Sequence, residues 1–267
     1  QAPHQVQVQS TGSFDGNRID NDLENNGMIT SHRISGHSGM EWPQGNSSYT
    51  VYASGLWIAG MVNGEIRTAV AEYAPEMTPG PFGSDGNASE YRLYEISAID
   101  LSDPLSNPDF QNWPTDDGAP FVDSDGDGVY TPMPDGGDYP ELLGDQMLWY
   151  LSNDNVESDH NIFGTLPLGL EVQTSIWGYD RNDELGDMMY VRSLIINKGV
   201  NEVSDAFVGI WSDPDIGNAG DDFVGCDTLL GLGYGYNDGA DTQFGIAAPA
   251  VGYDFIQGPM VASVGDT

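Results

Sequence analysis

Positive charge is what this sequence has least of. Its 267 residues include 42 Asp and Glu but only seven Lys and Arg, for a formal net charge of −35 at pH 7. Nucleic acids and anionic membrane surfaces repel such a chain, because both carry dense negative charge themselves. We therefore expect no nucleic-acid partner and no membrane insertion, and we expect divalent cations to be attracted.

Cysteines and long apolar runs are also scarce. Cys226 is the single cysteine, so an intrachain disulfide has no second thiol. No stretch approaches the roughly 20 apolar residues that span a bilayer. The chain starts at Gln1 rather than Met, which favours a processed N-terminus. We expect a secreted protein, part of a longer parent chain, whose loops are held by ions in place of disulfides.

Catalytic signatures are missing. The chain contains no Gly-x-Ser-x-Gly elbow, Walker loop, His-Glu-x-x-His motif or dinucleotide fingerprint. Paired carboxylates for glycoside hydrolysis are available, but with 42 acids no pair is informative without geometry. We expect a protein that is not an enzyme, and a secreted hydrolase is the remaining enzymatic alternative.

The sequence is rich in segments where apolar and polar residues alternate, the pattern typical of β-strands. Hydrophobic residues make up 39% and aromatic residues 10%, enough to bury a core. The dipeptide Asn63-Gly64, favoured in type I′ turns, predicts a hairpin over residues 50–73. Further strands are predicted at residues 91–99, 146–151, 168–179, 188–197, 205–213 and 228–237. Because no segment has a 3.6-residue period, we expect an all-β antiparallel sandwich, or several, with long calcium-binding loops and little helix.

The chain divides into three regions on this pattern. Residues 1–110 form an N-terminal β region with the hairpin, residues 111–165 form acidic connecting loops, and residues 166–267 form C-terminal sandwich strands. No low-complexity linker separates them, so one continuous domain is the alternative.

The segment DSDGDGVY, residues 123–130, is the most informative stretch. It places Asp123, Asp125 and Asp127 at ligand positions 1, 3 and 5 of an EF-hand loop, and Val129 at the backbone-carbonyl position. Alternating carboxylates repel one another unless a cation lies among them. We therefore predict a Ca²⁺ site, against the alternative of a solvated acidic turn.

The second half of the loop departs from that pattern. Pro134 replaces the bidentate glutamate of position 12, and the prolines that follow disfavour flanking helices. Asp135, Asp138 or Glu141 would then complete the ligand set from further along the chain. We expect a helix-free calcium loop.

Two other oxygen-rich stretches are weaker candidates. Asp213, Asp215, Asp221 and Asp222 follow a predicted strand and form a second candidate metal site, against a solvated edge. Residues 153–161 form a third, in which a single histidine, His160, favours a hydrogen-bonding loop over a transition-metal site.

Six tryptophans raise a carbohydrate-binding alternative. The pattern predicts core packing for Trp57, Trp149, Trp177 and Trp211, which lie inside predicted strands. Trp42 and Trp113 precede prolines in predicted loops, so they are the candidates for stacking on sugar rings, although local packing is favoured for both.

Several segments taken together resemble a recurrent module in large secreted proteins of Bacteroidota- and Ignavibacteria-like bacteria, chains that commonly end in a type IX secretion sorting domain. The segments are GMEWPQG (39–45), YASGLWIAGMVNGEIRTA (52–69), GAPFVDSDGDGVY (118–130), GDYPELLGDQ (137–146) and GIWSDPDIGNAGDDFVGCD (209–227). The resemblance implies a cell-surface or released protein and supplies no activity.

These observations together predict an extracellular, calcium-stabilised structural or adhesive surface protein. Its expected partners are calcium ions and copies of itself or other surface proteins, within a larger assembly or filament. A carbohydrate-binding module of a secreted degradative enzyme, with glycans as partners, is the alternative.

Overall fold

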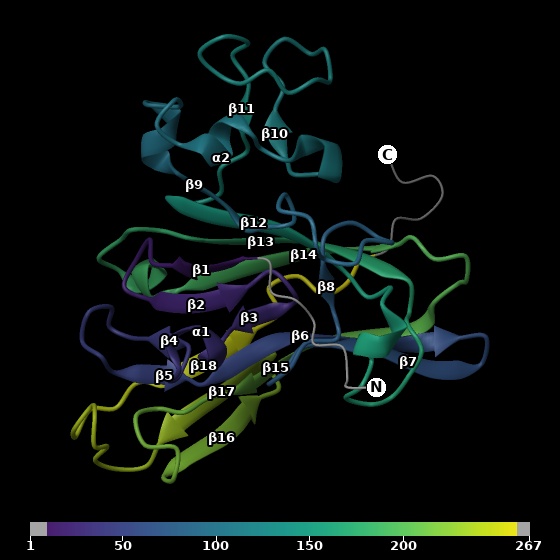
Figure 1. Ribbon diagram of the computed structural model, residues 1–267. Helices are drawn as coiled ribbons and strands as arrows, with labels where there is room; N and C mark the ends of the chain where they lie inside the picture. The colour runs from purple at the N-terminus through teal and green to yellow at the C-terminus, as the bar shows by residue number, and fades with distance from the viewer. Residues whose placement is uncertain (1–9, 261–267) are drawn as a thin grey trace.

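Residues 10–260 are described by a computed structural model of the chain (Figure 1). Strands account for 41% and helices for 9%, in several antiparallel sheets, so the predicted all-β class is confirmed. The outer ends of the first and third predicted regions, residues 1–9 and 261–267, lie outside the described residues.

The first half of the chain contains short strands and one long hairpin. Its strands are β1 (Thr11–Phe14), β2 (Asp20–Glu24), β3 (Met28–Thr30), β4 (Met40–Glu41), β5 (Tyr49–Val51), β6 (Ala53–Val62), β7 (Glu65–Val70), β8 (Thr78–Pro79), β9 (Tyr94–Ser97), β10 (Phe121–Val122) and β11 (Tyr139–Pro140). Its helices are α1 (His32–Ser35) and α2 (Pro108–Gln111), with 3-10 turns η1 (Ala98–Leu101) and η2 (Thr115–Asp117).

The second half has longer strands. They are β12 (Gln146–Asn153), β13 (Leu170–Gly178), β14 (Met189–Asn197), β15 (Ser204–Asp213), β16 (Asp222–Asp227), β17 (Leu232–Asn237) and β18 (Ala250–Asp254), with 3-10 turns η3 (Glu157–Asp159) and η4 (Glu184–Asp187).

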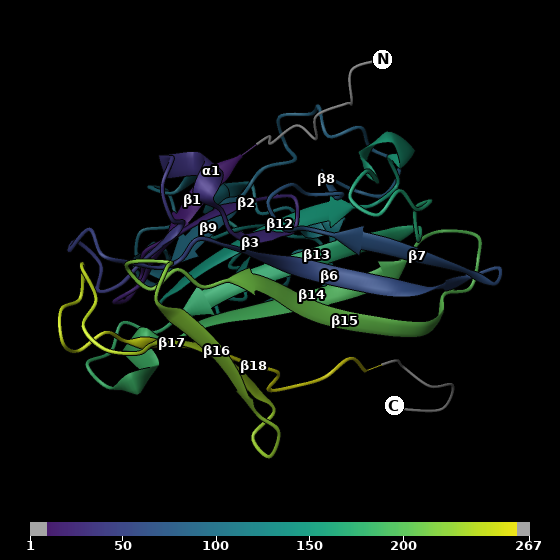
Figure 2. The same ribbon diagram turned by 90° about the horizontal axis from the view of Figure 1, so that it is seen from below.

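Two sheets face each other as a sandwich. One has the order β14-β13-β12-β8, with β9 also pairing with β12, and the other has the order β15-β6-β3, with β7 also pairing with β6. Figure 2 shows β6 and β15 in front of β13 and β14. Smaller sheets, β1-β2-β4-β5 and β16-β17-β18, and the β10-β11 pair complete the fold.

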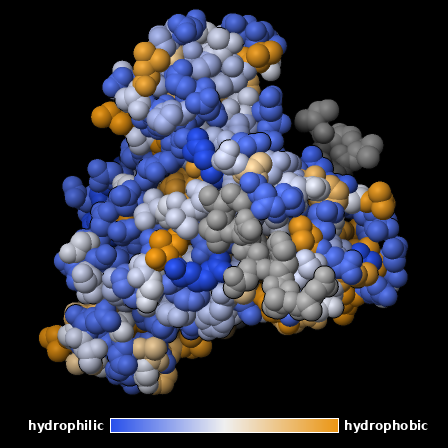
Figure 3. Space-filling model, viewed as in Figure 1, coloured by the Kyte–Doolittle hydropathy of each residue, from blue (hydrophilic) through white to orange (hydrophobic). Residues whose placement is uncertain are grey.

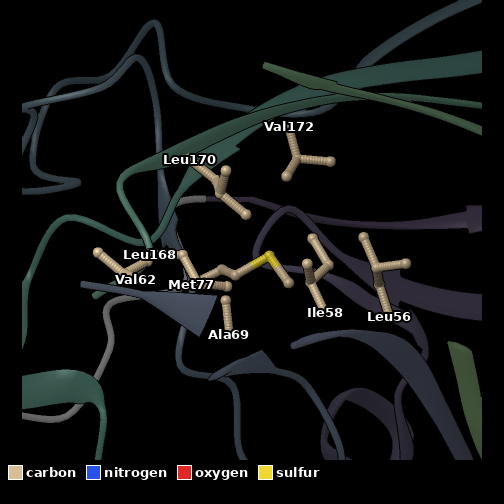
Figure 4. Close-up of a cluster of buried hydrophobic side chains, with 8 residues drawn as sticks. All are labelled: Leu56, Ile58, Val62, Ala69, Met77, Leu168, Leu170 and Val172. Carbon is tan, nitrogen blue, oxygen red and sulfur yellow. The ribbon is translucent and has the colours of Figure 1, made fainter. Parts of the chain in front are cut away.

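An aliphatic cluster fills the space between the two sheets (Figure 4). Leu56 and Ile58 of β6 lie opposite Leu170 and Val172 of β13, with Met77 between, and each is at most 4% exposed. Strand alternation explains the arrangement, because every second side chain of β6 and β13 points to the same face. Burying each such side chain contributes about 1.5–3 kcal/mol.

The predicted hairpin is confirmed. β6 and β7 pair from Trp57 opposite Val70 to Val62 opposite Glu65. Asn63 and Gly64 both have positive φ, 53° and 82°, as a type I′ turn requires. The local sequence therefore sets this register.

Other predicted strands are present with different ends. β9 covers only residues 94–97 of the predicted 91–99, because Ser97 begins the η1 turn and shares a capping box with Asp100. Residues 228–231 form the turn that joins β16 to β17. The strands β13, β14 and β15 follow the predicted ranges closely.

β12 is buried on both faces. Its Leu148 and Tyr150 pack toward Phe14 and Ile176, and its Met147 and Trp149 pack on the opposite side. That opposite side is covered by residues 98–145, which we call the covering segment and which stands above β12 in Figure 1. The strand predicted at residues 146–151 is therefore confirmed as β12, and it is a central strand inside the region predicted as connecting loops, residues 111–165.

The sheets also join the N-terminal and C-terminal regions. β15 pairs with β6 from Asp213 opposite Ala53 to Ser204 opposite Met61. β12 pairs with β9 and with β13. Neighbouring strands in one sheet thus come from all three predicted regions, an arrangement typical of one continuous domain.

The tryptophans of the strands lie on outer sheet faces rather than between the sheets. Trp57 and Trp211 alternate with Ile58 and Ile210, whose side chains face the aliphatic cluster. Trp177 packs on the outer side with Trp149. Only Trp149 of the four is fully buried, at 2% exposed, because the covering segment lies over it. Core burial was thus correct for Trp149, and the other three are half-buried.

Candidate metal centre

The covering segment includes residues 123–130, the predicted calcium loop, which we call the ion loop. β10 and β11 pair through Phe121 opposite Pro140 and Val122 opposite Tyr139, so the chain leaves and returns at one point. Between them, Gly126 and Gly128 have φ of 79° and 78°. These left-handed turns are accessible to glycine at no steric cost, and they fold the aspartates back on themselves.

Three carboxylates converge in this loop. One ligand oxygen from each of Asp123, Asp125 and Asp127 lies within 4.8 Å of the others. In residues 10–260 no other set of three or more His, Cys, Asp or Glu side chains meets this distance. The alternating spacing read from the sequence therefore corresponds to a real cluster.

Backbone amides hold each carboxylate in place. Asp123 accepts from Gly126 N at 2.7 Å and from Gly128 N at 2.8 Å. Asp125 accepts from Asp127 N at 3.1 Å, and Asp127 accepts from Val129 N at 2.7 Å. The bonds from two or three residues ahead are Asx turns, and the bond from Gly128 N, five residues ahead, closes a wider turn onto Asp123.

The loop is electrostatically suited to a hard cation. The amide of Gly128 holds the pKa of the Asp123 carboxyl below its usual range, so this group stays ionised. Carboxylate oxygens are the ligands that Ca²⁺ prefers, and Ca²⁺ accepts irregular sets of six to eight oxygens. Asp125 and Asp127 are exposed, which leaves room for water ligands.

Asp138 has a different place from the one predicted. It is 1% exposed, and its two oxygens accept from Ser124 N and Thr131 N, both at 2.8 Å. It therefore fastens the two ends of the loop together, and it is not among the converging carboxylates. Asp135 is exposed and also lies outside that cluster. Neither residue is positioned as the closing ligand in this structure.

The second acidic stretch does not assemble in the same way. Asp213 accepts from the Tyr73 hydroxyl, and Asp222 accepts from Ile216 N, both at 2.8 Å. Burial, with the charges of Asp213 and Asp222 nearby, raises the pKa of Asp215 to about 6. Asp213, Asp215, Asp221 and Asp222 are close enough to repel one another, yet they are not brought to mutual ligand distance.

The third stretch contributes a buried polar network that the sequence did not indicate. His160 and Asp154 lie with Glu76 in the interior, each at most 4% exposed. Asp154 accepts from the backbone amides of Leu168, Gly169 and Leu170 at 2.6–2.9 Å. The sequence suggested a hydrogen-bonding role for His160, but nothing near Glu76 in the chain marks it as the partner.

The two tryptophans considered for sugar stacking are held by local packing. Trp113 is 3% exposed and its indole N–H donates to Pro120 O at 3.0 Å. Trp42 packs against the cluster of Phe14 and Leu23, and its indole N–H donates to Asp187 at 2.8 Å. The favoured alternative of local packing is therefore the one observed, and Trp113 exposes too little surface to be a stacking platform.

No protein-family model, curated protein or solved structure matches this chain in comparisons with known proteins. In residues 10–260, no helix is both long enough and apolar enough to cross a membrane.

Proposed function

We propose that this protein is a secreted, calcium-stabilised structural or adhesive module of a cell surface, a subunit of a larger assembly. The convergence of Asp123, Asp125 and Asp127 within 4.8 Å in an exposed loop carries the proposal. Three ionised oxygens at this spacing gain attraction from a divalent cation, and without one they repel each other.

The ion would act on the covering segment as a fastener. The loop is tied at its base by Asp138 and by the β10-β11 pair, and its tip is held by hydrogen bonds from the loop's own backbone to its aspartates. A bound Ca²⁺ would fix the tip, and its binding free energy would add to the stability of the native state by mass action. With a single cysteine in the chain, no intrachain disulfide is available for this purpose.

The acid excess supports the same setting. A net charge of −35 disfavours the compact state through self-repulsion, and divalent ions screen that repulsion. On the face shown in Figure 3 hydrophilic residues predominate and apolar residues form small scattered groups. A face of this kind, without a large apolar patch, favours association through specific contacts over non-specific hydrophobic association.

Two long strands offer such a contact. Among the described residues, β14 pairs only with β13, and β15 pairs only with β6. Ile195 and Val208 face the aliphatic cluster from these strands but are only partly buried, whereas Val172 and Ile58 beside them are 1% and 2% exposed. A strand added by another subunit would pair the free edge and cover this side of the core, which is how edge strands polymerise.

The decisive experiment is a thermal melt in calcium, in magnesium and in chelator, with sizing by light scattering in the same buffers. We expect calcium to raise the melting temperature more than magnesium does, because Mg²⁺ demands a stricter octahedral site. Equal melting in calcium and chelator would overturn the ion site, and a monomer in every buffer would overturn the assembly.

A further inference from the structure

A pocket lies directly beside the ion loop. Its volume is about 430 Å³, within the range of small-molecule sites. Its lining comes from the end of α2, the η2 turn, Phe121 of β10 and the last residues of the ion loop, Gly128 to Tyr130. Neither the fold nor the proposed ion site requires this pocket.

The pocket combines aromatic walls with unused hydrogen-bond acceptors. Phe121 and Tyr130 are half-buried and line the pocket with rings that meet edge to face, 5.3 Å apart at 79°, whereas Trp113 is 3% exposed and offers almost no surface to a ligand. The Tyr130 hydroxyl is fixed by donating to Phe110 O at 2.7 Å. Because these rings are already fixed in the free protein, a ligand that packs on them would bind with little entropic cost for ordering side chains.

The polar lining is rich in acceptors. Asn112 and Gln111 both use their amide nitrogens on backbone carbonyls, which leaves their side-chain oxygens. The Asp116 carboxylate and the Thr115 hydroxyl, which also line the pocket, make no hydrogen bond to any other residue in the described range 10–260. The ligand that suits this lining must donate several hydrogen bonds.

Charge and polarity narrow the ligand class further. No Lys, Arg or His lines the pocket, and Asp116 is acidic, so phosphate, sulfate and carboxylate groups find no cationic partner. A purely apolar ligand would strip water from the acceptors without replacing their hydrogen bonds. A sugar ring satisfies both demands, because its hydroxyls donate and its C–H faces pack on aromatic rings.

We infer that this pocket binds one residue of a neutral glycan, and that ion binding in the adjacent loop strengthens the interaction. The coupling follows from shared residues: Gly128 N donates to Asp123 and Val129 N donates to Asp127, so the ion ligands hold two lining residues. The coupling rests on the proposed ion site, whereas the pocket itself does not. A glycan contact of this kind would give the surface module its adhesive partner.

The test is an array of neutral and acidic oligosaccharides probed with the whole chain in calcium, followed by titration calorimetry with the strongest sugar. Phe121→Leu keeps apolar bulk but removes the ring, and Asp116→Asn removes the charge with little change of shape. We expect each to weaken binding at least tenfold. Asp103→Asn is the matched control, because Asp103 is an exposed acid of the same covering segment that does not line the pocket.

The outcomes separate the pocket from the ion site. Binding of no array sugar, binding only of the acidic oligosaccharides, or sugar binding that both pocket variants retain would each overturn the neutral-glycan assignment, whatever the calcium melts show. Sugar binding that weakens severalfold in chelator supports the coupling. Equal sugar affinity in calcium and chelator overturns the coupling. If the melting temperatures in calcium and chelator are also equal, the ion site is ruled out, whereas the glycan assignment of the pocket is unaffected.

Discussion

The His160 Nδ1 atom lies 3.7 Å from the Glu76 Oε2 atom, and both side chains are completely buried. Neither atom has a hydrogen-bond partner. The other ring nitrogen, Nε2, is 2.7 Å from Asp154 O, and because a carbonyl only accepts, Nε2 carries a proton. Nδ1 and Oε2 would therefore repel each other as two acceptors unless one of them also holds a proton.

This pair predicts a pH dependence of stability. Burial raises the pKa of the Glu76 carboxyl, so the native state holds a proton that the unfolded chain gives up at lower pH. The contribution is present below the unfolded pKa of Glu and is lost as pH rises through the higher folded value. We expect the free energy of unfolding to fall in this range as pH increases.

Glu76→Gln should reduce that loss. Glu76 Oε1 accepts from Ile162 N at 2.9 Å, and the glutamine carbonyl can keep this bond while its amide donates to His160 Nδ1. Urea unfolding from pH 5 to pH 9 is the measurement, with the exposed His37→Gln as control. An unchanged pH profile for Glu76→Gln would rule out the shared proton.

The ion loop predicts a calcium-specific effect of Asp125→Asn combined with Asp127→Asn. The variant loses two of three anionic ligands, so calcium affinity and the calcium-induced rise in melting temperature should both fall. At a calcium concentration 100 times the dissociation constant, the lost stabilisation is about 2.7 kcal/mol. Asp103→Asn combined with Asp180→Asn removes the same charge at exposed positions, and should leave the calcium shift intact.

Substitution by alanine should have a large effect on stability at Asp138 and a small one at Asp135. Asp138→Ala leaves Ser124 N and Thr131 N without their acceptor, at a cost of about 1–3 kcal/mol, and loosens the base of the loop. Asp135→Ala should change stability by less than about 0.5 kcal/mol, because Asp135 is exposed. Chemical denaturation in chelator measures both, and equal stabilities would contradict the fastening role of Asp138.

Asp215 predicts a second pH effect, in the second acidic stretch rather than in the ion loop. Its pKa of about 6 lies above the unfolded value, mainly through burial and then through Asp213 and Asp222. Its contribution is therefore present below about pH 4 and is lost as pH rises through about 6. In chelator at pH 7.5, Asp215→Asn should stabilise the protein by on the order of 1 kcal/mol after allowance for solvent screening.

The same variant distinguishes two interpretations of the second acidic stretch. If calcium binds there, Asp215→Asn removes a ligand and the stabilisation turns into destabilisation at high calcium. If the stretch is a solvated edge, calcium leaves the difference between the variant and the parent chain unchanged. Melting curves in calcium and in chelator decide between them.

Local sequence patterns were enough to predict the all-β class, the hairpin and the convergence of aspartates in the ion loop. Asn63-Gly64 fixes its turn through backbone preferences of two adjacent residues, and β13 alternates because one of its faces packs inward. The convergence of Asp123, Asp125 and Asp127 was predictable for the same reason. Alternating residues of a tight turn approach one another whatever the rest of the chain does.

Roles that depend on distant partners were not predictable. Asp138 follows the acidic loop and looks like a ligand in the sequence, but the β10-β11 pairing turns it toward Ser124 N and Thr131 N. Trp177 lies in a strand rich in apolar residues, yet its position in the alternation sends it to an outer face. Glu76 and His160 are 84 positions apart, and only folding brings them together.

The sequence by itself determined the long strands, the hairpin turn and the close approach of the loop aspartates, because hydrophobic alternation, turn residues and closely spaced carboxylates act over a few residues. Tertiary structure decided which faces are covered, which acid fastens the loop, and where the pocket forms beside it. Those properties depend on how β9, β12 and the covering segment pack, and packing energy is shared among residues that the chain order keeps apart.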